Sequence, residues 1–85
     1  MSNSIGYHLT EIEKGTVGES SKILEEVHEL LDAEAQGSKI MALAELSDLY
    51  GAIEMYLLQN HPDIEMDDLK IMSQITTRAF ENGRR

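Results

Sequence analysis

Residues 25–29 read Glu-Glu-Val-His-Glu and residues 45–48 read Glu-Leu-Ser-Asp, and these two acidic motifs decide how the chain is organised. The second motif lies in residues 40–58, IMALAELSDLYGAIEMYLL, a run with three acidic residues and no lysine or arginine. A helix that is apolar nearly all round is usually buried. Carboxylates in a buried site must be paired, protonated or bound to a metal ion. Because this run supplies no basic partner, we expect a bound cation.

Composition limits the class of protein. The chain has 85 residues, a formal net charge of −9 and no cysteine. We expect one domain, residues 1–85, with an irregular or extended N-terminal arm at residues 1–15. The acidity argues against a general nucleic-acid-binding surface, which needs clustered lysine and arginine. No apolar run approaches the roughly 20 residues of a membrane span and no secretory pattern opens the chain, so we expect a soluble, intracellular protein.

The first helix is expected at about residues 17–36. Thr16 followed by Glu19 fits a capping box at its start, and Gly37 is placed to end it. One face of this helix is apolar, with Ile23, Val27, Leu30 and Leu31. The other face carries Lys22, Glu25, Glu29 and Asp32. Two interpretations of this second face stay open: a solvated acidic surface, or a divalent-cation site that relieves the repulsion between like charges one turn apart.

The second helix is expected from Ser38, its N-cap, to about Asn60, and the third from about Met66 to Asn82. The second helix has an apolar stripe at Leu46, Leu49, Tyr50, Ile53 and Leu57. Its adjacent stripe is also largely apolar, so this helix should lie between neighbours, some from another subunit. Gly51 would allow one of them a close approach. The fold class is all-α, a compact bundle of about three main helices that oligomerisation completes.

The third helix and the residues after it are basic. Lys70, Arg78, Arg84 and Arg85 fall in the last sixteen positions. Cations near a helix C-terminus are favoured by the helix dipole, which is one explanation. The other is a clamp for phosphate groups, for which charge and position indicate Lys70, Arg78 and Arg84.

The paired motifs Glu25-Glu26-x-x-Glu29 and Glu45-x-x-Asp48 resemble the signature of the MazG-like all-α nucleoside triphosphate pyrophosphohydrolases, a superfamily that includes phosphoribosyl-ATP pyrophosphohydrolase. The lead-in at residues 22–26, KILEE, is similar to the family's approach to its first motif. The ending RAFENGR at residues 78–84 resembles the tails of short phage and bacterial members. The resemblance covers the chain from about Thr16 onward.

This resemblance implies an enzyme that hydrolyses a nucleoside triphosphate, or a related nucleotide, to monophosphate and pyrophosphate. It implies a cytoplasmic homo-oligomer, dimer or tetramer, in a bacterial or phage-infected cell, with Mg²⁺ or Mn²⁺ as cofactor. Metal-ligand roles fall on Glu26, Glu29, Glu45 and Asp48. Glu25 and Glu26 are the catalytic candidates, with Glu25 as a ligand or a water-orienting residue. Such an ion prefers carboxylate oxygens, waters and substrate phosphates.

Two other classes of function remain open from the sequence. The first is a non-catalytic helical assembly or binding module with a vestigial acidic metal site. Replacing Glu45 and Asp48 by their amides would then leave stability unchanged or raise it. The second is an acidic regulatory partner of a basic protein, whose binding would depend strongly on salt.

Overall fold

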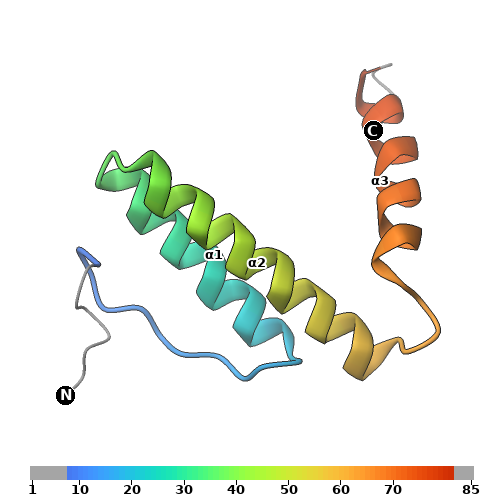
Figure 1. Cartoon of the computed structure of the whole chain (residues 1–85), viewed down its shortest axis with the longest axis horizontal. Helices are drawn as coiled ribbons and strands as arrows, with labels where there is room; N and C mark the ends of the chain where they lie inside the picture. Colours follow the sequence, from blue (N-terminus) through green and yellow to red (C-terminus); the bar gives the residue numbers. More distant parts are fainter. Residues whose placement is uncertain (1–7, 82–85) are drawn as a thin grey trace.

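The computed structural model describes residues 8–81, except for the side chains of residues 79 and 80 (Figure 1). These residues form three helices, α1 (Ser20–Ala35), α2 (Lys39–Asn60) and α3 (Met66–Glu81), preceded by an arm without regular structure at residues 8–19. The all-α prediction is confirmed. Between residues 8 and 81, no helix combines the length and the apolar character that crossing a membrane requires.

A tight connection folds α1 and α2 into an antiparallel hairpin (Figure 1). Gly37 has a φ of +73°, which glycine adopts without the steric cost that a Cβ brings. Its amide donates to the carbonyl of Glu34 at 3.0 Å, and the amide of Ser38 donates to that of Ala33 at 3.3 Å. The Ser38 hydroxyl accepts from the amide of Met41 at 3.1 Å, which caps α2. The predicted stop at Gly37 and cap at Ser38 are confirmed.

The predicted start of α1 was wrong. The helix begins at Ser20 rather than at residue 17, and Glu19 occupies the N-cap without a side-chain capping bond. Thr16 contributes its carbonyl, which accepts from the Glu19 amide at 2.9 Å, so no capping box forms. The cause is Gly18, whose φ of +91° makes a turn that a helix cannot include. A Cβ at Gly18 would also collide with the side chain of Gln59.

The hairpin is packed with its acidic side inward. Buried carboxylates face the contact between α1 and α2, whereas Leu24 and Leu31 on the apolar side of α1 are each 55% exposed. Among the described residues the buried hydrophobic side chains are Ile12, Ala33, Ala52 and Leu57. The expected core stripe of α2 is only partly buried, because Leu46 and Tyr50 face outward. Too little apolar surface is covered in one chain to make a conventional core.

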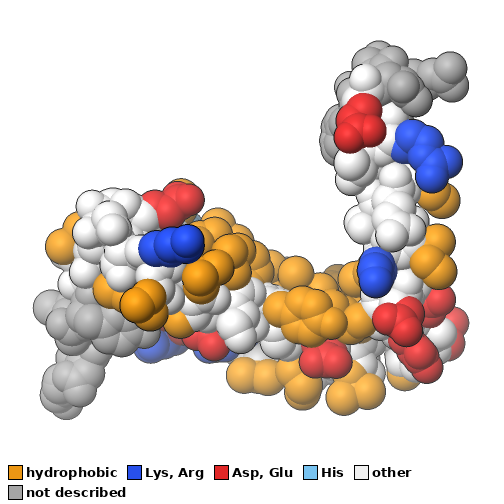
Figure 2. Space-filling model, turned by 45° about the horizontal axis from the view of Figure 1, so that its top comes forward, with side chains coloured by type: hydrophobic (Ala, Val, Ile, Leu, Met, Phe, Trp, Pro, Cys, Tyr) orange, Lys and Arg blue, Asp and Glu red, His pale blue; other side chains and the backbone are white. Residues whose placement is uncertain are grey.

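Helix α3 stands away from the hairpin (Figure 1) and makes at most marginal contact with it. The Cα radius of gyration is 15.1 Å, whereas a compact domain of this length has about 12 Å. Helix α2 therefore keeps an uncovered row of large apolar side chains, which we call the outer stripe: Ile40, Leu43, Leu46, Tyr50 and Leu58. Figure 2 shows hydrophobic side chains exposed along the hairpin and on α3.

Gly51 lies in the middle of α2, and a Cβ built on it meets no atom within 4 Å. Glycine inside a helix lowers stability relative to alanine, so Gly51→Ala should raise the free energy of unfolding by about 1 kcal/mol. Urea denaturation at a fixed protein concentration measures the change. A loss of stability would instead mean that a second subunit packs closely on Gly51.

Candidate metal centre

Four carboxylates from the two helices of the hairpin converge on one point. Glu26 and Glu29 are three residues apart on α1, and Glu45 and Asp48 are three residues apart on α2, so each pair lies on one helix face. One oxygen of each carboxylate lies within 4.8 Å of an oxygen of each of the others. Only Asp48 is exposed, and Glu45 is just 2% exposed. The structure thus brings together the four residues that we call the acidic cluster.

The donor atoms of the acidic cluster fit a hard divalent ion. All four ligands are carboxylates, which suit Mg²⁺ and Mn²⁺ better than the soft metals. Oxygen Oε1 of Glu26 is fully buried and has no hydrogen-bond partner, although Oε2 of the same carboxylate lies 3.1 Å from Nζ of Lys22. An unpaired buried oxygen costs free energy, which a bound cation would offset. Burial, together with hydrogen bonding to Glu45 and the charge of Glu26, raises the pKa of Glu29 from 4.5 to about 8. A divalent ion bound to the carboxylates would favour their ionised form and so oppose this rise.

Glu25 lies beside the acidic cluster but is already paired. Its carboxylate accepts from the amide of Gly15 at 2.8 Å and from Nζ of Lys22 at 3.2 Å, and Nζ of Lys14 lies 3.5 Å away. Burial acts to raise the pKa of Glu25, but these partners outweigh it and hold the pKa below its ordinary value. The structure therefore places Glu25 as an anchored anion next to the cluster. A water-orienting role for Glu25 stays a prediction.

Lys22 is the basic side chain that touches the cluster. Its Nζ lies 3.1 Å from Glu26 and 3.2 Å from Glu25. Burial opposes its charged form, yet hydrogen bonds to Glu26 and Glu25 outweigh that effect and raise the pKa of Lys22. One ammonium group balances only part of the negative charge of the four carboxylates.

A groove opens beside the acidic cluster. It has a volume of about 490 Å³, within the range of small-molecule sites, and Glu26 and Asp48 line it together with Lys22. The remaining lining residues are Val17, Ser47, Gly51, Ala52 and Met55. The groove is therefore lined by both charged and apolar side chains.

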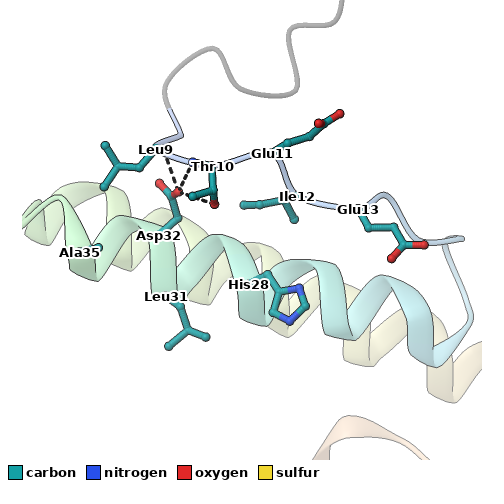
Figure 3. Close-up of a pocket in the computed structure, with 9 residues that line it drawn as sticks. All are labelled: Leu9, Thr10, Glu11, Ile12, Glu13, His28, Leu31, Asp32 and Ala35. Atoms are coloured by element: carbon teal, nitrogen blue, oxygen red, sulfur yellow. Dashed lines mark hydrogen bonds between the residues drawn. The ribbon is translucent and has the colours of Figure 1, made fainter.

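The N-terminal arm is bound to the side of α1 (Figure 3). Asp32 Oδ2 accepts from the amides of Leu9 and Thr10 at 2.8 and 3.1 Å, and Asp32 Oδ1 accepts from Nε2 of Gln36 at 2.6 Å. Burial raises the pKa of Asp32, but these donors outweigh it and the pKa falls below its ordinary value. The imidazole of His8 is buried beside Asp32. Asp32 is thus an anchor for the arm, not part of a solvated face.

Two of the three basic residues predicted to contact phosphate, Lys70 and Arg78, lie on α3. Helix α3 makes at most marginal contact with the hairpin (Figure 1), so one chain does not bring these two side chains to its own acidic cluster. Arg84 lies outside the described residues. Their contact with phosphate stays a prediction that requires the α3 of another subunit or a different placement of α3.

Sequence reasoning found the four cluster residues but gave too little weight to Lys22, Asp32 and His8. The spacing of Lys22 from Glu25 and Glu26, three and four residues, was the available signal. Gln36, four residues after Asp32, was a local signal for Asp32. The contacts of Asp32 and His8 across the arm had no such signal, because they join residues more than twenty positions apart. Comparison of the chain with protein-family models, curated proteins and solved structures finds no match.

Proposed function

We propose that this protein is a Mg²⁺-dependent nucleotide pyrophosphohydrolase of the MazG-like type, acting in the cytoplasm on a nucleoside triphosphate or a related nucleotide. The observation that carries the proposal is the acidic cluster: four carboxylates from two facing helices, three of them buried, with oxygens within 4.8 Å. Such a cluster is costly in a folded protein without a cation. Mn²⁺ is expected to replace Mg²⁺.

The groove beside the cluster supports a nucleotide as the ligand. Phosphate oxygens bound in the groove would meet Lys22 and an ion held by the acidic cluster, and Val17 and Met55 offer apolar surface to a base. When bound, the divalent ion supplies charge neutralisation on the phosphates and lowers the pKa of a bound water. Lys22 holds Glu25 and Glu26 in place, and its ammonium group adds positive charge next to the leaving phosphates.

Pyrophosphate release from a panel of NTPs, dNTPs and phosphoribosyl-ATP, with Mg²⁺ present, tests the proposal. Wild type is compared with Glu45→Gln and Asp48→Asn, and with Glu54→Gln, an exposed acid on the same helix, as the matched control. We expect release by wild type and by the control, and at least a hundredfold loss in both cluster variants. Metal binding without release from any nucleotide would favour the non-catalytic binding module.

We also propose that the chain works as a homo-oligomer, a dimer or a tetramer. The described residues bury four hydrophobic side chains, whereas the outer stripe of α2 and the residues Ile71, Met72 and Ile75 of α3 stay exposed. Exposed apolar patches of this kind usually mark a protein interface. A second copy would cover the outer stripe and bring another α3, with Lys70 and Arg78, toward the hairpin.

The oligomer should depend on the outer stripe. Leu43→Glu combined with Leu46→Glu places two charges in that stripe, and both positions are exposed in one chain, so the fold of the hairpin does not require them. Size-exclusion chromatography with light scattering measures the oligomeric state. We expect the double variant to be a monomer and wild type to be a dimer or larger. Glu54→Gln, within the same face of α2, is the control. A wild-type monomer at micromolar concentration would contradict the proposal.

A further inference from the structure

The N-terminal arm has an attachment to α1 that does not depend on His8. The amides of Leu9 and Thr10 donate to Asp32, and the amide of Gly15 donates to Glu25 at 2.8 Å. Between these two anchors the side chain of Ile12 is buried, and Figure 3 shows it directed toward α1. Two carboxylates and one apolar contact thus hold residues 9–15 against the helix.

His8 extends this attachment to the acidic cluster. Its side chain is only 6% exposed and lies between two carboxylates. Nδ1 is 3.6 Å from Oδ1 of Asp32, and Nε2 is 3.9 Å from Oε2 of Glu29. Glu29 belongs to the acidic cluster and Asp32 does not. Both separations are longer than a hydrogen bond, so the imidazole lies at ion-pair distance from a carboxylate that anchors the arm and from a carboxylate of the acidic cluster.

We propose that His8 and Asp32 are positioning residues that hold the Glu29 carboxylate in the orientation for divalent-ion binding. This inference rests on the proposed function, because it assigns a role within the same site. Groups that contact a metal ligand from behind restrict its rotamers and orient its lone pairs, and replacing such groups typically weakens metal binding about 10–100-fold. Asp32 is suited to the role because three donors, Leu9 N, Thr10 N and Gln36 Nε2, fix its own carboxylate.

Mn²⁺ affinity, measured by titration calorimetry on the full chain, tests the inference. The variants are His8→Ala, His8→Gln and Asp32→Asn, with His28→Ala as the matched control, since His28 is exposed on the same side of α1 and lines the cavity under the arm. We expect about tenfold weaker binding in His8→Ala and Asp32→Asn. His8→Gln keeps an amide donor next to Glu29 and should recover most of the affinity, which a purely structural loss would not allow. His28→Ala should bind as wild type does.

Other outcomes overturn the inference in distinguishable ways. If His8→Ala binds Mn²⁺ as tightly as wild type while Glu45→Gln does not bind, the positioning role is wrong and the metal site stands. Equal weakening in His8→Ala and His28→Ala would show a general disturbance of the arm and would also contradict it. If wild type itself does not bind Mn²⁺, both the inference and the proposed function are wrong. Should His8→Ala fail to fold, His8→Gln and Asp32→Asn decide the question.

Discussion

Glu45→Gln is expected to stabilise the metal-free protein and, at the same time, to abolish its stabilisation by Mg²⁺. Glu45 is the most deeply buried acid of the cluster, and its carboxylate lies among those of Glu26, Glu29 and Asp48. The amide has nearly the same shape and no charge, so it removes both repulsion and the cost of burying an anion. We expect the free energy of unfolding of the metal-free protein to increase by about 1–2 kcal/mol. In a domain of this size, that increase corresponds to a melting temperature about 5–10 °C higher.

Thermal unfolding with and without saturating Mg²⁺ measures both effects. Wild type should melt at a higher temperature when Mg²⁺ is present, because an ion that binds only the folded state stabilises it. Glu45→Gln should show no such shift. Glu54→Gln, exposed on α2, should behave as wild type does in both conditions. A Glu45→Gln variant that is less stable than wild type yet still responds to Mg²⁺ would contradict the account.

The metal-free protein should lose stability as the pH rises from about 4.5 to 8. Burial and the neighbouring acids raise the pKa of Glu29 from 4.5 to about 8, so within this range the folded state holds a proton that the unfolded chain has released. The contribution of Glu29 to stability is then full below pH 4.5 and is lost as the pH rises to about 8. The slope for one proton is at most about 1.4 kcal/mol per pH unit. The ionisable groups facing Glu29 are His8 on the arm, Glu25 and Glu26 on α1, and Glu45 and Asp48 on α2.

Glu25 and Asp32 change the pH dependence of stability in the opposite direction to Glu29, and in a lower pH range. Their pKa values are lowered in the folded state, so the stability they contribute is lost only as the pH falls below their ordinary range near 4.

Urea denaturation at pH 5.5, 6.5, 7.5 and 8.5 isolates the effect of Glu29. Glu29→Gln should flatten the dependence, and Mg²⁺ affinity of wild type should increase over the same range because the ion competes with the proton. Equal stability of metal-free wild type at pH 5.5 and 8.5 would contradict this explanation.

Local signals in the sequence were enough to locate the helices and the four cluster residues. Gly37 and Ser38 carry their own conformational and capping preferences, so the hairpin connection could be predicted from them. The spacing of three residues within each acidic pair placed each pair on one face. The start of α1 was predicted wrongly because the local Thr16–Glu19 pattern was given more weight than Gly18, which lies between these two residues.

The sequence does not say which helix face meets which neighbour. The acidic side of α1 could be a solvated surface by composition alone, and its burial follows from contacts with α2 and with the arm. Asp32 binds the arm through backbone amides, which leave no trace in residue identity. The position of α3 was likewise not predictable, because its apolar face finds no partner within the described chain.

The most direct test of the acidic cluster as a metal centre is anomalous diffraction from crystals grown with Mn²⁺. We expect an anomalous peak between α1 and α2, with oxygens of Glu26, Glu29, Glu45 and Asp48 at about 2.1 Å or bridged to the ion by water. Data from Glu45→Gln crystals provide the control, in which the peak should be absent. If saturating Mn²⁺ gives no peak there in wild type, and the carboxylates keep their places around Lys22 alone, the cluster is not a metal site.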